Sequence, residues 1–157
     1  MMQCRPVVVL AVAAMMAAGL ANCAADPSDV PGAAQTVDDG LRVVEIEMID
    51  MAFRPDSIDV TSGETIRLRF HNGGQAIHDA VVGDLAFQEE HDAEMAAGAT
   101  HPADGAGDGE TGQTTLLVAP GDTADMVYTA GEAAGMIIGC HQPGHWNAGM
   151  RAALNIT

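Results

Sequence analysis

Residues 140–150 read CHQPGHWNAGM and place one thiol, two imidazoles and one thioether in a single short stretch. The donors are Cys140, His141, His145 and Met150. Thiolate, imidazole and thioether are soft or borderline ligands, and together they favour copper over calcium, magnesium or zinc. A structural zinc site would use more cysteines and no methionine. The stretch therefore predicts a mononuclear copper site with one Cys, two His and a weak axial Met.

Only one of the two histidines in this loop is a predicted ligand. Adjacent residues on a strand point to opposite faces, so Cys140 and His141 do not easily converge on one ion. The Pro-Gly pair at 143–144 predicts a turn that folds the chain back and returns His145 to the thiolate. We therefore assign His145 to the metal and expect His141 to point away.

The second imidazole has to come from another part of the fold, and His78 is the candidate. It follows the turn sequence NGG at 72–74, which ends a predicted strand over 66–70. Strand ends that are distant in sequence can meet at one pole of a β-sandwich. The predicted ligands are His78, Cys140, His145 and Met150, with no catalytic residue.

Four segments alternate apolar and polar residues, which is typical of half-buried strands. They are 44–48, 66–70, 124–128 and 152–156. Turn residues separate them, and no helical pattern of similar strength is present. The pattern predicts an all-β fold, an antiparallel β-sandwich, formed by residues 41–157.

Residues 140–150, called the copper loop below, and several upstream motifs resemble those of the cupredoxins. The resemblance is closer to the bacterial plastocyanin/azurin-like group that includes the auracyanins. The motifs are PGHWNAGM at 143–150, FRP at 53–55, IDV at 58–60, GETI at 63–66, FHNG at 70–73, His78, and VAPG at 118–121. The resemblance covers residues 43–157. It implies a Greek-key β-sandwich or barrel, one type 1 copper ion and one-electron transfer. Asp79, Ile138 and His141 depart from the usual pattern beside the ligands, a change that can shift a redox potential.

The N-terminal sequence predicts export. Arg5 and the apolar run over 7–20 are typical of a signal peptide, which we place at residues 1–25. The sequence LANC at 20–23 resembles a lipobox, although Asn22 departs from it, and Cys23 would then carry a lipid. Ordinary cleavage after Ala24 or Ala25 is the alternative. Either route predicts a periplasmic location or one on the outer face of the cell membrane, followed by a flexible linker over 26–40.

The charge of the chain restricts its partners. All 22 Asp and Glu residues lie beyond residue 25, against five Arg and no Lys, which leaves that part with a net charge of −17. Such a surface disfavours nucleic acid and anionic membrane surfaces. We expect redox proteins of cationic character as partners, membrane attachment only through a lipid at Cys23, and a monomer.

Residues 84–113 form an acidic, Ala- and Gly-rich insertion. Its first half predicts a short helix and its second half an exposed loop. The composition favours a solvated acidic segment without metal. The alternative is an auxiliary copper-capture site, in which His91 and Met95 share one face of that helix and act with His101.

Two functions from different classes use the same predicted site. The first is a blue-copper electron carrier, which is not an enzyme. The second is a protein for copper storage, resistance or delivery. A thiol hydrolase built on Cys140 and His145 is a third, weaker hypothesis, because it leaves His78 and Met150 unexplained.

Overall fold

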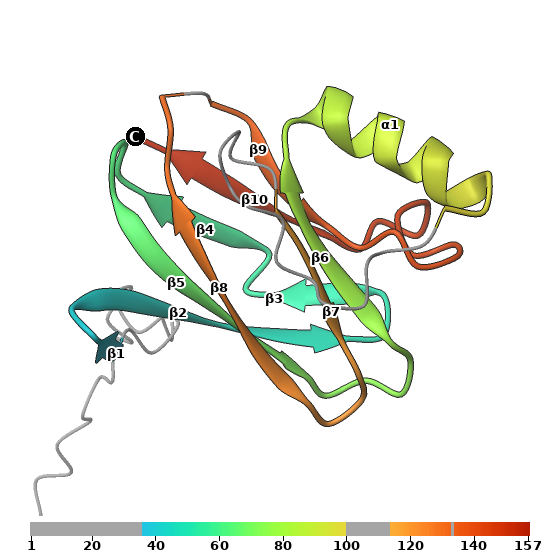
Figure 1. The fold of residues 1–157 in the computed structure, drawn as a ribbon, viewed down its shortest axis with the longest axis horizontal. Helices are drawn as coiled ribbons and strands as arrows, with labels where there is room; N and C mark the ends of the chain where they lie inside the picture. Colours follow the sequence, from blue (N-terminus) through green and yellow to red (C-terminus); the bar gives the residue numbers. More distant parts are fainter. Residues whose placement is uncertain (1–35, 100–113, 133) are drawn as a thin grey trace, which may run out of the picture. The chain divides into compact units, whose positions relative to one another are not determined.

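The computed structural model describes residues 36–99, 114–132 and 134–157. These residues form ten strands in two sheets and one helix (Figure 1). The predicted signal peptide, Cys23, residues 26–35 of the predicted linker, and His101 lie outside the described residues. No helix in the described part of the chain is long and apolar enough to cross a membrane.

Each sheet has five strands. The first has the order β1 (Thr36–Asp38), β2 (Leu41–Ile49), β5 (Thr65–Asn72) and β8 (Thr123–Thr129), with β3 (Ala52–Arg54) paired to β2. The second has the order β4 (Ser57–Val60), β10 (Arg151–Ile156), β9 (Met136–Gly139), β6 (His78–Gly83) and β7 (Thr114–Val118). Strand β1 occupies the last part of the predicted linker and pairs with the first residues of β2.

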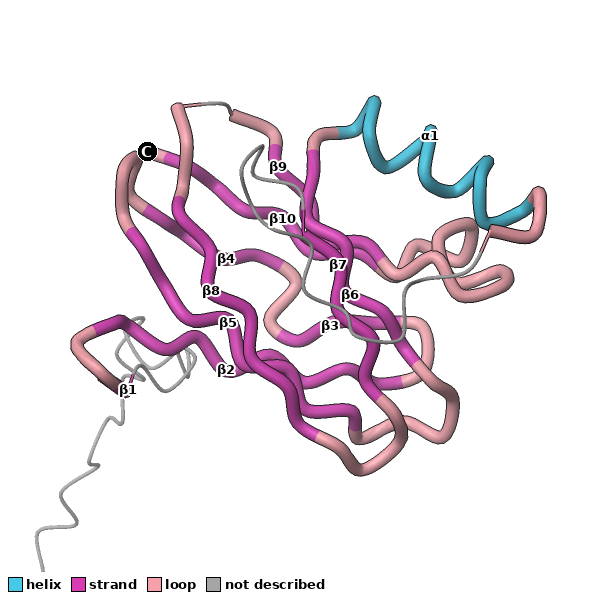
Figure 2. The backbone as a smooth tube through the Cα atoms, viewed as in Figure 1, coloured by secondary structure: helices cyan, strands magenta, loops and turns pink. Residues whose placement is uncertain are grey.

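The apolar alternation of the sequence becomes the core between the sheets. The inward side chains of β2, Val44, Ile46 and Met48, are all buried, and β5 buries Ile66, Leu68 and Phe70 in the same way. Side chains on one face of a strand recur every second residue, so this pattern identifies the face that meets the core. The predicted two-sheet β-sandwich is confirmed, and Figure 2 shows its two layers.

The predicted antiparallel pairing is confirmed for six of the eight strand pairs among the described residues and is wrong for two. Strand β2 pairs with β5 in parallel, and β10 pairs with β4 in parallel, so each sheet is mixed. Parallel neighbours require a long connection between them. Here the chain leaves β2 through β3 and β4 before it returns to the first sheet in β5.

The predicted helix is confirmed as α1 (Leu85–Ala96). Asp84 caps its N-terminus, accepting a hydrogen bond from the amide of Phe87 at 2.9 Å. In Figure 1 the helix lies beside β6 and β9, with the β9–β10 loop near its C-terminal end. Strand β6 is buried at every residue, because Val82 faces the core and the helix covers the other face. That double burial explains why β6 shows no polar alternation in the sequence.

Candidate metal centre

Three of the four predicted ligands, His78, Cys140 and Met150, lie next to strand ends at one end of the second sheet. Strands β6, β9 and β10 are neighbours, and Val81 pairs with Gly139, which also pairs with Arg151. His78 begins β6, Cys140 follows β9, and Met150 precedes β10. The antiparallel pairing therefore gathers these three positions at the same edge, although they are distant in sequence.

The ligand atoms of His78, Cys140 and His145 form a small triangle. The two Nδ1 atoms are 3.2 Å apart, and Cys140 Sγ lies 3.3 Å from His145 Nδ1 and 3.8 Å from His78 Nδ1. Metal bonds of about 2.0 Å to nitrogen and about 2.3 Å to sulfur separate neighbouring ligands by about 3–4 Å. The triangle has these dimensions, so the three donors fit around one ion. All three residues are buried.

The turn between Cys140 and Met150 is closed by backbone hydrogen bonds. The amide of Cys140 donates to the carbonyl of Met150 at 3.1 Å, and the amide of Met150 donates to the carbonyl of His145 at 3.0 Å. Gly144 adopts a φ of 85°, a conformation that favours glycine. The loop backbone thus ties Met150, a fully buried residue, to two of the three clustered donors.

Burial favours the uncharged forms of the Cys140 thiol and the His78 imidazole before a metal binds. Desolvation, followed by the charge of Asp79, raises the pKa of the Cys140 thiol above its usual range. Desolvation and the neighbouring His145 lower the pKa of His78. A neutral imidazole is ready to bind a metal, whereas the thiol has to lose its proton to become a ligand.

His141 lies outside the triangle and is held from several sides. Its amide donates to Asp79 Oδ1 at 2.6 Å, and its ring Nε2 donates to Gln88 Oε1 at 2.6 Å. Its ring stacks on Trp146, with centroids 4.8 Å apart. The loop residue after Cys140 is therefore fixed by β6, by α1 and by the loop itself.

Helix α1 packs against the copper loop with the face that carries the two predicted capture residues. The ring of His91 meets the ring of His141 edge to face, at 4.9 Å between centroids. Met95 lines a groove of about 320 Å³ together with Asp92, Pro143 and Asn147. His91 and Met95 thus lie where the helix meets the loop.

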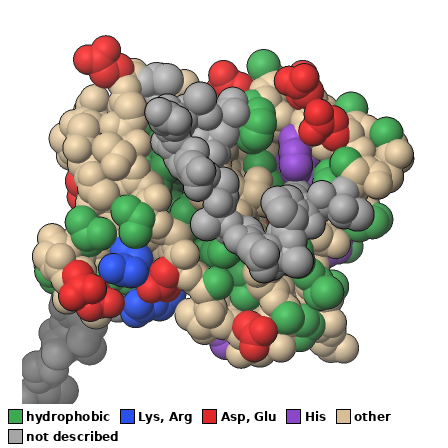
Figure 3. Space-filling view, in the orientation of Figure 1, with side chains coloured by type: hydrophobic (Ala, Val, Ile, Leu, Met, Phe, Trp, Pro, Cys, Tyr) green, Lys and Arg blue, Asp and Glu red, His purple; other side chains and the backbone are tan. Residues whose placement is uncertain are grey.

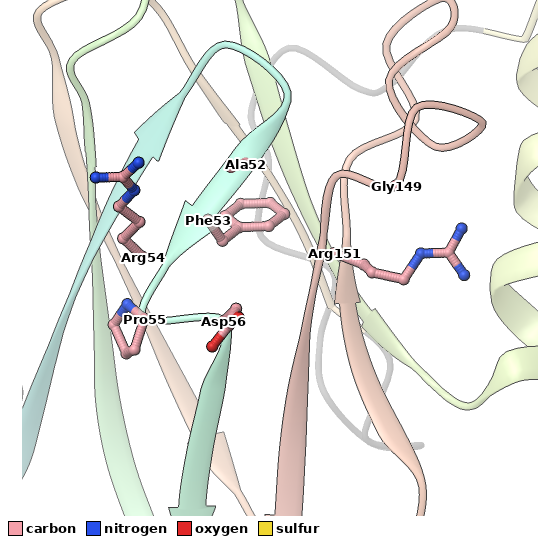
Figure 4. Close-up of a pocket in the computed structure, with 7 residues that line it drawn as sticks. All are labelled: Ala52, Phe53, Arg54, Pro55, Asp56, Gly149 and Arg151. Carbon is pink, nitrogen blue, oxygen red and sulfur yellow. The ribbon is translucent and has the colours of Figure 1, made fainter.

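A second hollow, of about 520 Å³, lies between the β3–β4 connection and the start of β10. Figure 4 shows its lining residues, with the guanidinium groups of Arg54 and Arg151 pointing away from each other. Arg151 instead stacks over Trp146, with 3.9 Å between its Cζ and the ring centroid. The two cations do not converge on a common ligand, and the lining contains no thiol or imidazole.

This fold and donor cluster are those of a copper protein, and comparison with known proteins defines the class. The sequence profile of the plastocyanin/azurin family of copper-binding proteins matches residues 42–157, so the chain belongs to this family. An auracyanin of Roseiflexus castenholzii has a similar structure, with a TM-score of 0.61, 24% identity, and coverage of 73% of this chain and 96% of that one.

Two curated relatives are both described as copper-resistant cuproprotein CopI. The protein of Pseudomonas aeruginosa is 31% identical over 137 residues, covering 73% of this chain and 76% of that protein. The protein of Rubrivivax gelatinosus is 35% identical over 112 residues, covering 69% of this chain and 62% of that protein, which is less than two thirds. The family and the donor cluster together identify copper as the metal that this chain binds.

Three side chains around the centre were not predicted from the sequence as contributors to the site: Asp50, Gln88 and Asp92. Asp50 Oδ1 lies 3.3 Å from His78 Nε2, and Asp92 Oδ1 lies 3.4 Å from His141 Nδ1. Each contact joins positions far apart in the chain, and none of these residues belongs to a recognisable motif. Gln88 is the buried residue of α1, but this burial becomes visible only once the helix is placed, so the sequence carried no signal for it.

Proposed function

We propose that the chain is an exported mononuclear blue-copper protein that transfers single electrons between redox partners. In this proposal His78, Cys140 and His145 are the strong ligands and Met150 is the weak axial one. The observation that carries it is the buried triangle of two Nδ1 atoms and one Sγ, already at metal-ligand spacing. No substrate is transformed, so the proposed protein is not an enzyme.

Bound copper supplies a one-electron couple between Cu(II) and Cu(I). The chain holds the donors at the ends of paired strands and in a hydrogen-bonded turn, so they need to move little between the two states. Cys140 and His78 are 0% exposed and His145 is 7% exposed. Electrons would therefore pass to a partner at the edge of His145, while the thiolate stays away from water.

The proposed partners are redox proteins with a cationic docking surface. Figure 3 shows acidic side chains gathered over α1, on the part of the fold that meets the copper loop. Opposite charges speed the encounter of two proteins and make its rate depend on salt. We propose a monomer that binds no nucleic acid and acts in the periplasm or on the outer face of the membrane, attached through a lipid if Cys23 is the mature N-terminus. Mass spectrometry of the mature protein tests the lipid.

A redox titration with metal analysis tests the electron-carrier function. The copper-loaded protein is cycled with mediators, and copper is counted after gel filtration of each state. A carrier gives one reversible one-electron step and keeps one copper in both states. Release of copper on reduction would contradict the proposal.

Copper storage, resistance or delivery is the second candidate, and the names of the two curated relatives favour it. The test is the copper tolerance of cells that lack the protein. Tolerance restored by the wild-type chain but not by Cys140→Ser would support this function. A copper content above one per chain that falls in the Met95→Ala variant would place extra metal at α1.

A further inference from the structure

The imidazole of His78 lies between the cluster of predicted copper ligands and a carboxylate. His78 turns its Nδ1 toward Cys140 Sγ and His145 Nδ1, at 3.8 and 3.2 Å. Its other nitrogen, Nε2, lies 3.3 Å from Oδ1 of Asp50, the residue that follows β2. If Nδ1 binds the metal, Nε2 keeps the proton of the neutral ring and lies next to the carboxylate.

The Nε2 atom of His78 is buried and has no hydrogen-bond partner within residues 36–99, 114–132 and 134–157. Oδ1 of Asp50, 3.3 Å away, lies within ion-pair distance of it. The same carboxylate oxygen is held by the backbone, because the amides of Gln75 and Ala76 donate to Asp50 Oδ1 at 3.0 and 3.3 Å. These bonds, chiefly that of Gln75, lower the pKa of Asp50, so the group is charged at neutral pH.

The backbone at Gly74 closes over the pair. A Cβ on Gly74 would lie 2.5 Å from Asp50 Oδ1 and 2.9 Å from His78 Nε2. Only glycine lets the chain pass this close without displacing either group. The Asp50 side chain is nevertheless 47% exposed, so water screens part of its charge and the expected effect is moderate.

We propose that Asp50 is a positioning residue for His78 and that its negative charge biases the copper site toward Cu(II). A carboxylate on the outer nitrogen fixes the ring orientation and makes Nδ1 a stronger donor. Reduction removes one positive charge from the ion, so a nearby anion stabilises the oxidised state more than the reduced one. The inference rests on the proposed function only in taking His78 as a copper ligand.

The test compares the whole protein with Asp50→Asn, which removes the charge and keeps an oxygen for the amides of Gln75 and Ala76. Three quantities are measured: the Cu(II) and Cu(I) dissociation constants and the reduction potential against mediator dyes, each reduced dye giving one electron to one Cu(II). We expect Cu(II) to bind about tenfold more weakly, at the lower end of the about 10–100-fold cost of changing an outer partner, because Asn keeps the oxygen and loses only the charge. With Cu(I) affinity unchanged, the potential rises by about 59 mV.

The matched control is Glu132→Gln, which removes one exposed charge just beyond β8, next to the end of β5 away from Asn72. It should leave all three quantities unchanged. Asp50→Ser is a second neutral variant if Asp50→Asn does not fold. A further readout is nitrogen NMR of the diamagnetic Cu(I) protein, in which the His78 Nε2 resonance should shift in Asp50→Asn.

Equal dissociation constants and potentials in wild type and both neutral variants would overturn the inference and leave the carrier function intact. A wild-type protein without a thiolate-to-copper band would instead refute the carrier function. In that case the Cu(II) dissociation constants of wild type and Asp50→Asn would still test the role of Asp50. The weaker Cu(II) binding of Asp50→Asn is expected whenever His78 is a copper ligand, whether or not the protein carries electrons.

Discussion

At the scale of single residues, Met150 combines complete burial with backbone bonds to two of the clustered donors. Its carbonyl accepts from the Cys140 amide, and its own amide donates to the His145 carbonyl. The backbone therefore holds the loop closed without the thioether. A substitution of this side chain should therefore change the properties of the bound copper more than the stability of the fold.

Met150→Leu should keep copper bound and raise the reduction potential. Leucine has nearly the same volume but no sulfur donor, so Cu(II) loses more stabilisation than Cu(I). We expect a shift of about 59 mV or more, a tenfold change for one electron, measured by mediated redox titration. The control is Met126→Leu in the core strand β8, and an equal potential in Met150→Leu and wild type would remove Met150 from the ligand set.

His78 gives the copper-free protein a defined pH dependence. Burial lowers its folded-state pKa below the usual 6.5, so the unfolded chain binds a proton that the folded chain does not. The free energy of unfolding should therefore keep its full value above about pH 6.5 and decrease as the pH drops toward the lowered pKa of His78. Urea unfolding of apo-protein at about pH 7.5 and about pH 5.5 measures this.

The histidine variants identify the titrating group. His78→Asn should lose this part of the pH dependence, whereas His71→Asn, at an exposed position on β5, should keep it. The lowered pKa values of Glu64 and Asp125 act in a more acidic window, below their usual 4.5 and 3.8. The same pH dependence in His78→Asn and wild type would contradict the assignment.

At the scale of elements, α1 is joined to the sandwich through Gln88. This fully buried side chain donates to the carbonyls of Val81 and Ile137 at 2.8 and 2.9 Å and accepts from His141. One side chain thus links the helix to β6, to β9 and to the copper loop. The helix therefore supports the loop that carries Cys140 and His145.

Gln88→Leu should destabilise the protein and disturb the copper loop. It removes the three hydrogen bonds of the buried Gln88 side chain, and each buried polar group left unsatisfied costs about 1–3 kcal/mol. Chemical denaturation of the apo-protein measures the loss. Glu90→Gln, on the exposed side of the same helix, should stay within about 0.5 kcal/mol of wild type. A stable Gln88→Leu protein would show that α1 is only loosely attached.

At the scale of the whole molecule, charge is unevenly distributed. Arg69 pairs with Asp125 at 2.8 Å and approaches Asp38 at 3.4 Å on the first sheet. The remaining acids greatly outnumber the arginines, and beyond residue 25 the net charge is −17. Repulsion among these carboxylates opposes the folded state.

Added sodium chloride should therefore raise the melting temperature. Ions at about 0.15 M shorten the range of charge repulsion to about 8 Å. The rise in melting temperature on adding salt should be smaller in a Glu89→Gln, Glu90→Gln double variant, because that variant carries two fewer negative charges. Calorimetry at low and moderate salt checks this, and a melting temperature that falls with salt would show that the ion pairs outweigh the repulsion.

Sequence periodicity predicted the sandwich well where strands are half-buried, as in β2 and β5. It failed where both faces are covered, as in β6, and it did not reveal the parallel pairings, which depend on the path between strands. The meeting of Cys140 with His145 was predictable because residue type and spacing in 140–150 act locally, whereas His78 joins them from the start of another strand. The partners Asp50 and Gln88 were not predictable, because each meets its histidine only through tertiary packing.

A Cu(II) titration of the purified protein, followed by visible absorption and electron paramagnetic resonance, tests the central claim most directly. The proposed site predicts an intense blue band that saturates at one copper per chain, bleaches on reduction and is absent from Cys140→Ser. A wild-type protein without this band, or a Cys140→Ser protein that keeps it, would contradict the claim.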